Sequence, residues 1–210
     1  MPPKSSPVHG DSAIAAEKRG LRALALSRRA GLAAALPDAG LAVRDHLMAG
    51  RVRLGLAEPG GRAVAAYWPI GDELDIRPAV AALAADGIAV AWPVVAGRGA
   101  PLIFRAWRPG EPLGQAGFGL SEPLPGAAAV VPGVLLIPLL AFDAAGFRLG
   151  YGAGYYDITL DALNGSGAVA VGVGYAGQRM ERVPRESHDR PMDWLLTENG
   201  LERAGGDAAP

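Results

Sequence analysis

The chain has 210 residues, of which 50% are hydrophobic and 20% are charged, with a formal net charge of −1 and no cysteine. This length predicts one domain with its own core, at residues 12–202, between flexible tails at 1–11 and 203–210. The near-zero charge argues against a nucleic acid as ligand. The lack of cysteine excludes disulfides and cysteine-based metal sites and is typical of a cytoplasmic protein. A small-molecule ligand is therefore expected.

The first part of the chain predicts two helices and a strand. Ser12 can cap a basic amphipathic helix over residues 12–36, and the many basic residues of that helix exclude a signal peptide or a membrane span. A second helix is expected at 38–48. A glycine-rich turn at 55–61 then leads into a strand at 63–68.

The middle of the chain predicts a strand-helix-strand unit. A helix at 75–86 is rich in alanine, and a short apolar strand follows at 88–95. Units of this kind build parallel sheets. A further strand is expected at 102–107, and the proline-rich segment 109–132 is expected to be an ordered surface loop.

The last third of the chain continues the alternation of strands and helices. Residues 134–142 are almost wholly apolar, which is typical of a strand buried on both faces. A helix is expected at 155–163, and strands at 168–173 and 194–197. The whole pattern predicts an α/β fold, a three-layer α/β/α domain with a mainly parallel central sheet that binds ligands at the carboxyl ends of its strands.

The most informative segment is the glycine-rich turn at 148–157, which is expected to precede a helix. Gly150, Gly152 and Gly154 let backbone N–H groups approach an anion, and the helix adds the positive end of its dipole. Arg148 adds a fixed positive charge beside the turn. The segment therefore predicts a phosphate site, although it is not a P-loop. A glycine-rich connection imposed by tight packing is the alternative.

A second glycine pattern, G-x-G-x-x-G, spans residues 172–177 and has an acid, Asp193, about 20 residues further on. This spacing is found in dinucleotide-binding turns. Such a site needs a complete crossover helix after the turn, whereas Pro184 follows within seven residues of Gly177. The dinucleotide interpretation is therefore disfavoured.

The segment 148–157 resembles the signature of the 5-formyltetrahydrofolate cyclo-ligase family. Four other segments match family motifs in the right order, so that the resemblance covers about residues 15 to 200. They are the K-x-x-[LI]-R pattern of residues 18–22, the acidic segment 67–75, the P-x-x-A-F-D pattern of 138–143, and a C-terminal group of Gln178, His188, Asp189, Thr197 and Glu198.

The resemblance implies a NagB/RpiA/CoA-transferase-like fold and a reaction. In this reaction, 5-formyltetrahydrofolate is converted to 5,10-methenyltetrahydrofolate with ATP and Mg2+, and ADP and phosphate are released through a phosphorylated imidate. A monomer that binds neither nucleic acid nor membrane is expected. Two rival interpretations are a non-catalytic binding protein of the same fold, and a relative of sugar-phosphate isomerases or CoA-transferases that does not use ATP.

The resemblance also implies which residues bind ATP. Lys18 and Arg148 are the implied catalytic cations, and Lys18 shares a helix face with Arg22 because they are four residues apart. The residues implied to contact ATP are Lys18, Arg19, Gly20, Leu21, Arg22, Arg148, Leu149, Gly150, Tyr151, Gly152, Ala153, Gly154, Tyr155 and Tyr156. A solvated helix face would also explain the basic pair, and core packing the tyrosines.

Other residues are implied to bind Mg2+ and folate. Asp157 and Asp189 match the family's Mg2+ positions, and Mg2+ prefers carboxylate oxygens; a helix cap or an ion pair is the alternative for each. The residues implied to bind folate are Trp68, Glu73, Tyr151, Gly152, Ala153, Gly154 and Tyr155. Glu73 would accept a hydrogen bond from the pterin, or it is simply an acid at a helix N-terminus.

Two positions in or beside the glycine-rich turn depart from the family pattern. Ala153 stands where members often have Gly or Lys, and Ile158 stands where bacterial members often have Arg. Each departure can remove one cationic contact to ATP. His188 has no second ligand at zinc spacing, so a histidine-centred metal site is not expected.

Overall fold

The computed structural model of the protein describes residues 9–56, 61–108, 110–115 and 121–206. Parts of four expected segments lie outside the described residues. These parts are 1–8 and 207–210 of the two tails, 57–60 of the glycine-rich turn, and 109 and 116–120 of the proline-rich loop.

Seven strands form one central sheet in the part of the chain that the structure describes. They are β1 (Val64–Ala65), β2 (Val90–Val94), β3 (Ile103–Ala106), β6 (Val134–Pro138), β9 (Val169–Val173), β10 (Trp194–Thr197) and β11 (Gly200–Arg203). Their order is β11-β10-β9-β6-β1-β2-β3, and only the edge strands β3 and β11 pair antiparallel with their neighbours. The expectation of a mainly parallel sheet in an α/β fold is confirmed.

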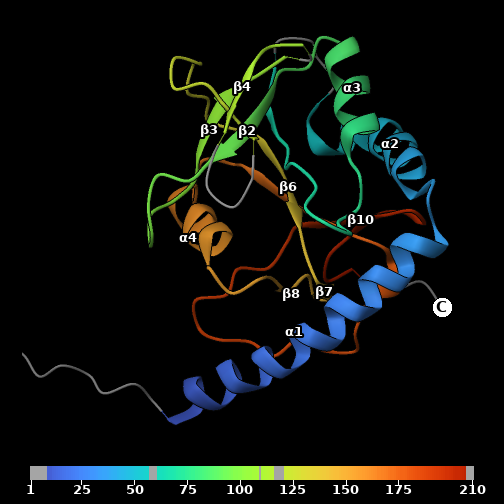
Figure 1. Cartoon of the computed structure of the whole chain (residues 1–210), viewed down its shortest axis with the longest axis vertical. Coiled ribbons are helices and arrows are strands. Elements are labelled where there is room, and N and C mark those ends of the chain that lie inside the picture. Colours follow the sequence, from blue (N-terminus) through green and yellow to red (C-terminus); the bar gives the residue numbers. More distant parts are fainter. Residues whose placement is uncertain (1–8, 57–60, 109, 116–120, 207–210) are drawn as a thin grey trace, which may run out of the picture.

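Helices cover both faces of the sheet (Figure 1). They are α1 (His9–Ala35), α2 (Ala39–Gly50), α3 (Arg77–Ala85) and α4 (Tyr155–Ala162). Successive strand residues point to opposite faces, so that Leu136 packs with α2 and α3 while Leu135 packs on the α4 side. Both leucines are fully buried. The result is the expected arrangement of three layers.

The apolar segment 134–142 forms two strands, so the prediction of one strand is wrong. β6 ends at Pro138, whose ring leaves no N–H for the sheet. The chain then forms β7 (Ala141–Phe142), which pairs with β8 (Arg148–Leu149) in a separate hairpin. The glycine-rich turn therefore begins in the second strand of this hairpin and does not directly follow the buried strand β6.

Two further elements differ from the sequence-based expectation. β4 (Leu113–Gln115) and β5 (Ser121–Pro123) form a small hairpin inside the segment that was expected to be a loop. β11 folds back on β10, although its Gly-Leu-Glu-Arg sequence has no strand pattern. Short, partly exposed strands carry too few alternating residues to be recognised.

The helix α1 lies across the end of the molecule that carries β7 and β8 (Figure 1). Its Ala25 packs in a buried cluster with Leu140 and Leu149. On the same helix Lys18 and Arg29 are buried, whereas Arg19 and Arg28 are exposed. The inner face of this long helix therefore carries the basic side chains of Lys18 and Arg29.

The glycine pattern at 172–177 serves packing. A Cβ atom at Gly174 would lie 2.7 Å from Gln178 Oε1, and a Cβ atom at Gly177 would lie 2.6 Å from Leu32 Cδ2. Between β9 and β10 the described chain forms only the short 3-10 helix η3 (Ala176–Gln178) and no crossover helix. A dinucleotide-binding unit is therefore absent from this described segment.

Replacing Gln178 by leucine is expected to lower the free energy of unfolding by about 3 kcal/mol, because three buried backbone groups would lose their partners. The Gln178 side chain donates to the carbonyl oxygens of Leu139 and Leu140, and it accepts from the backbone N–H of Tyr175. Urea denaturation measures this change. The exposed Arg182→Leu exchange is the control, and equal stability of the two variants would show that water replaces the amide.

Candidate active site

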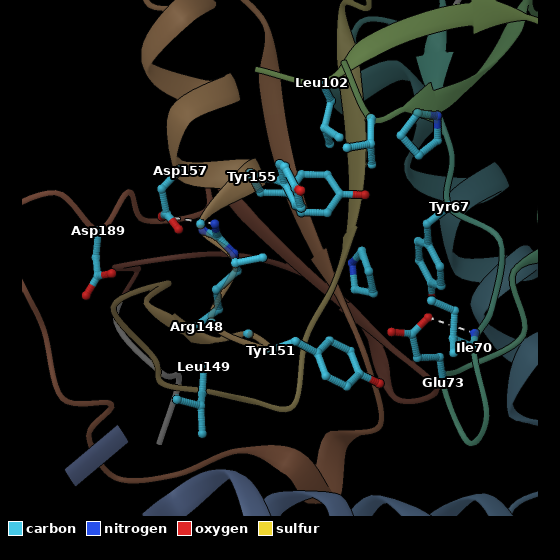
Figure 2. A pocket seen from close by; sticks show the side chains of 18 of the residues that line it. Tyr67, Ile70, Glu73, Leu102, Arg148, Leu149, Tyr151, Tyr155, Asp157 and Asp189 are labelled. Atoms are coloured by element: carbon cyan, nitrogen blue, oxygen red, sulfur yellow. Dashed lines mark hydrogen bonds and ion pairs between the residues drawn. The ribbon is translucent and has the colours of Figure 1, made fainter. Parts of the chain in front are cut away.

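A cavity of about 320 Å³ opens at the carboxyl ends of three parallel strands. Trp68 follows β1, Pro93 lies near the end of β2, and Pro138 is the last residue of β6. The glycine-rich turn and α1 form the opposite wall (Figure 2). Crevices at this end of open α/β sheets are the usual place for ligands, as the sequence pattern predicts.

The glycine-rich turn folds around the side chain of Arg22. Arg22 Nε donates to the carbonyl oxygen of Gly150 over 2.9 Å. Gly152 has a φ of +99°, and a Cβ atom there would lie 3.0 Å from the Arg22 guanidinium carbon. Gly154, with a φ of +71°, is the N-cap of α4, so that the positive end of that helix begins at the cavity.

Lys18 is paired with two carboxylates at the edge of the cavity. Its ammonium lies 2.8 Å from Glu186 Oε2 and 2.5 Å from Asp189 Oδ2. Only 5% of Lys18 is exposed. The Asp189 carboxylate also accepts from the backbone N–H of Glu186 over 2.7 Å. In this structure Asp189, an expected Mg2+ ligand, is thus the counter-ion of an expected ATP ligand.

Arg148 and Asp157 form a second pair of the same kind (Figure 2). Arg148 Nη2 lies 2.9 Å from Asp157 Oδ1, and Arg148 Nη1 donates to the carbonyl oxygen of Arg190. The same Asp157 oxygen accepts from the backbone N–H of Arg190. Arg148 therefore joins the start of the glycine-rich turn to α4 and to the segment that contains Asp189.

The opposite end of the cavity is aromatic and contains Glu73 (Figure 2). The rings of Trp68 and Trp92 lie 5.2 Å apart between centroids. The Glu73 carboxylate is buried and accepts from the backbone N–H of Ile70 over 2.9 Å. Burial raises the pKa of Glu73 above its usual value. The Tyr67 hydroxyl donates to the carbonyl oxygen of Leu74, and its pKa is also raised by burial.

The structure brings most of the expected site residues together. The expected residues that line the cavity are Lys18, Arg22, Trp68, Glu73, Arg148, Leu149, Gly150, Tyr151, Gly152, Ala153, Gly154, Tyr155, Tyr156, Asp157 and Asp189. Arg19, Gly20 and Leu21 do not line it. Arg19 and Gly20 are exposed on the outer side of α1, and Leu21 packs near β7 and β8. One face of a helix reaches the cavity, so a continuous run of five residues was too broad an expectation.

Several residues of the cavity were missed by sequence reasoning. They are Tyr67, Ile70, Trp92, Pro93, Val95, Leu102, Glu122, Pro138, Glu186 and His188. Those at the ends of β1, β2 and β6 could have been found from the rule that ligands bind at the carboxyl ends of strands. Glu122 gave no such signal, because it lies in the hairpin that was not expected.

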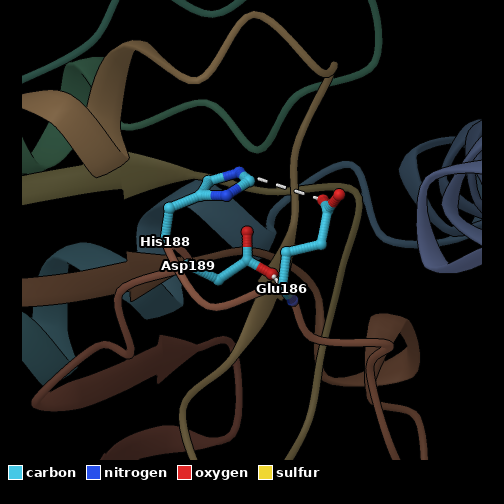
Figure 3. Close-up of side chains that lie close together, drawn as sticks. All are labelled: Glu186, His188 and Asp189. Carbon is cyan, nitrogen blue, oxygen red and sulfur yellow. Dashed lines mark hydrogen bonds and ion pairs between the residues drawn. The ribbon is translucent and has the colours of Figure 1, made fainter. Parts of the chain in front are cut away.

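Glu186, His188 and Asp189 form a small cluster, although a histidine-centred metal site was not expected (Figure 3). One ligand atom from each lies within 4.8 Å of the others. His188 Nε2 is 3.9 Å from Glu186 Oε2, and His188 is exposed. The two carboxylates already contact the Lys18 ammonium, so a cation would have to displace that ammonium.

The fold and the cavity define an α/β protein with a glycine-rich turn at the carboxyl ends of a parallel sheet. The sequence model of the 5-formyltetrahydrofolate cyclo-ligase family matches residues 15–198. The chain belongs to this family of enzymes.

Individual relatives agree with this assignment. The chain is 38% identical over 145 residues to a 5-formyltetrahydrofolate cyclo-ligase of Mycolicibacterium smegmatis, with 65% of this chain and 74% of the relative covered. It is 33% identical over 142 residues to the 5-formyltetrahydrofolate cyclo-ligase of Escherichia coli K12, with 64% and 76% covered.

Two solved structures share the fold. The NMR structure of Aquifex aeolicus 5,10-methenyltetrahydrofolate synthetase has a TM-score of 0.75 and 29% identity, covering 92% of this chain and 95% of the other. A 5,10-methenyltetrahydrofolate synthetase from Mycoplasma pneumoniae has a TM-score of 0.64 over 86% of this chain and 98% of the other. At 20% identity the second likeness shows the fold alone. Within the described residues, no helix combines the length and apolar character needed to cross a membrane.

Proposed function

We propose that the protein converts 5-formyltetrahydrofolate to 5,10-methenyltetrahydrofolate with ATP and Mg2+, releasing ADP and phosphate. The observation that carries the proposal is a single cavity with a charged end and an aromatic end, in a member of the cyclo-ligase family. A triphosphate fits the charged end and a flat pterin ring fits the aromatic end. The two reacting groups would meet between these ends.

The charged end has the groups that a triphosphate requires. Lys18, Arg22 and Arg148 reach the cavity beside the glycine-rich turn. The turn offers backbone N–H groups, and α4 offers its N-terminus. Phosphoryl transfer depends mainly on positioning and charge stabilisation, so these cations suffice without a protein nucleophile.

The balance of charge supports the need for a divalent cation. Five acidic residues line the cavity, Glu73, Glu122, Asp157, Glu186 and Asp189, against three basic residues, Lys18, Arg22 and Arg148. A free triphosphate would add more negative charge to this excess. Mg2+ would neutralise it, and carboxylate oxygens such as those of Asp157 and Asp189 are its preferred protein ligands. When bound, Mg2+ would withdraw charge from the phosphate oxygens.

The two ion pairs of the cavity would rearrange when the nucleotide binds. The ammonium of Lys18 and the guanidinium of Arg148 would turn toward the phosphates, which offer stronger acceptors. The carboxylates of Asp189 and Asp157 would then be free to hold the cation. The same residues thereby serve as mutual counter-ions before binding and as ligands afterwards.

The aromatic end has the groups that a pterin requires. Trp68 and Tyr155 offer flat surfaces, and the buried Glu73 carboxylate can accept an N–H of the pterin. The formyl oxygen would attack the γ-phosphorus atom, ADP would leave, and N10 would attack the formyl carbon of the phosphorylated imidate. Phosphate would then leave as the ring closes.

The test is the absorbance of the methenyl product after 5-formyltetrahydrofolate and Mg-ATP are added to the purified protein. Product is expected only when ATP and Mg2+ are both present. Asp157→Asn and Arg148→Ala are each expected to lower kcat by about a hundredfold, because each removes a group from the phosphate end. Asp161→Asn is the control, since Asp161 lies one turn further along α4 and is exposed.

The outcome also separates the rival interpretations. A folded wild-type protein that makes no product but binds Mg-ATP in calorimetry would be a binding protein of the same fold. A protein that binds no Mg-ATP would instead favour the isomerase-like interpretation. Equal activity of Asp157→Asn and Asp161→Asn would show that the Asp157 carboxylate has no role in the reaction.

We further propose that the enzyme is a cytoplasmic monomer whose partners are its two small-molecule substrates. The lack of cysteine suits a reducing compartment, and the net charge of −1 gives no attraction to nucleic acid. Light scattering at working concentration measures the mass, and a mass of 21.5 kDa is expected for the monomer.

A further inference from the structure

Arg29 is a buried cation beside the cavity that does not line it. It lies near the end of α1 with 3% of its surface exposed. Its Nη2 donates to the Tyr151 hydroxyl over 2.6 Å, and its Nη1 lies 3.7 Å from Glu73 Oε1. The guanidinium carbon is 5.5 Å from the centre of the Tyr151 ring. Arg29 therefore stands behind two residues that are expected to bind folate.

The hydrogen bonding of Arg29 is incomplete. Its Nε and Nη1 atoms are buried and have no hydrogen-bond partner among the described residues. A buried guanidinium with unpaired N–H groups is costly unless its charge is compensated nearby. The Glu73 carboxylate is the acidic group paired with that charge, and it lies just beyond hydrogen-bond range at 3.7 Å from Nη1.

Burial and Arg29 act on Glu73 in opposite directions. Burial raises the pKa of Glu73, while the N–H of Ile70, the charge of Arg29 and the Tyr151 hydroxyl lower it. The tyrosines that face Glu73 from the other elements, Tyr67 and Tyr156, have pKa values raised by burial and stay neutral. Among the described residues, Arg29 is the cation that favours the charged form of Glu73.

We propose that Arg29 is a positioning residue for folate binding, which supplies the counter-charge of Glu73 and holds the Tyr151 ring in place without contacting the substrate. The inference rests on the proposed function, in which Glu73 accepts a pterin N–H. The guanidinium of Arg29 thus links α1 to the glycine-rich turn through Tyr151 and to the segment after β1 through Glu73.

The test compares Arg29→Met with Arg28→Met, an exposed neighbour on the same helix. Without the cation the pKa of Glu73 rises further, so that Glu73 stays protonated to a higher pH. The acid limb of kcat/KM for 5-formyltetrahydrofolate is expected to move to higher pH, and KM for folate to rise about tenfold, because a neutral carboxyl group accepts an N–H more weakly than a carboxylate does. KM for ATP is expected to stay within about twofold, because Arg29 does not line the cavity and its side chain contacts Tyr151 and Glu73.

Further variants keep the proposal open to refutation. Arg29→Lys retains the charge and is expected to restore the acid limb, but it cannot reproduce the forked contact with both Tyr151 and Glu73, so KM for folate stays raised. If Arg29→Met does not fold, the test uses Arg29→Lys and Tyr151→Phe instead. A KM for folate equal to that of the wild type in both variants would overturn the proposal. An unshifted acid limb in folded Arg29→Met would also overturn it.

Calorimetric binding of 5-formyltetrahydrofolate separates this proposal from the proposed reaction. Folate binding that weakens at acid pH in the wild type, and weakens at a higher pH in Arg29→Met, supports the role of Arg29 even if no product forms. Folate binding with the same pH dependence in both proteins refutes the role of Arg29 while leaving turnover intact.

Discussion

Gly152→Ala is expected to lower ATP-dependent turnover by about a hundredfold while the protein stays folded, since a displacement of about 1 Å in a site can cost this much. The φ of +99° at Gly152 is strained for any residue with a Cβ atom. The new methyl group would also lie 3.0 Å from the Arg22 guanidinium carbon. Because Arg22 holds the turn through Gly150, the turn and its cation would move apart.

Gly165→Ala is the matched control for this prediction. Gly165 has a φ of +80°, but a Cβ atom there would meet nothing within 4 Å. Thermal denaturation of both variants measures the cost of the backbone strain, which should be similar. Steady-state kinetics then measures the displacement of Arg22, which should appear in Gly152→Ala alone. Equal turnover in the two variants would show that the turn does not depend on Arg22.

Lys18→Met is expected to lower the free energy of unfolding by about 3 kcal/mol and to abolish turnover. The side chain of Lys18 is 6% exposed, and its two acidic partners, Glu186 and Asp189, are each 14% exposed. Removal of the ammonium would leave two adjacent carboxylates repelling each other in a poorly solvated place. The same change would remove a proposed phosphate ligand.

The double variant Lys18→Met with Asp189→Asn separates the two effects. It removes one of the unpaired charges, so that part of the stability should return in urea denaturation, whereas turnover should remain lost. Arg28→Met is the control for removal of an exposed base from α1. A Lys18→Met protein as stable as the wild type would mean that water solvates the two carboxylates well.

The layered fold could be predicted because hydrophobic periodicity is strong in the central strands. β9 and β10 were each expected to within one residue of their bounds, since buried parallel strands are short apolar runs between turns. The break after Pro138 could not be predicted with the same certainty. Pro138 ends β6, but the path of the chain after it involves Gln178, which donates to the carbonyl oxygens of Leu139 and Leu140 from about 40 residues away, and no local pattern shows such a partner.

Arg29 could have been found from the sequence by helix geometry. Lys18, Arg22 and Arg29 are four and seven residues apart, a spacing that keeps all three on one helical face. Arg19 and Arg28 fall on the outer face and are exposed. If the basic residues had been grouped by helical face, the expected set would have been Lys18, Arg22 and Arg29 in place of the continuous run 18–22.

The pairing of charges in the cavity could not have been predicted from the sequence. Asp157 and Asp189 were chosen for their carboxylates, and both line the cavity. Their partners come from distant parts of the chain, because Lys18 precedes Asp189 by 171 positions. A sequence shows which groups can carry charge, whereas only the fold shows which of them neutralise one another.

The position of α1 has a consequence for how the protein folds during its synthesis. Its side chains meet Tyr151, Gly150 and Asp189, which follow them by 122, 128 and 171 positions. Contacts between such distant positions carry a large loop-closure cost and form late in folding. During synthesis the first helix leaves the ribosome long before the last of its partners. The chain is therefore expected to acquire its binding cavity only after the segment that contains Asp189 has been released.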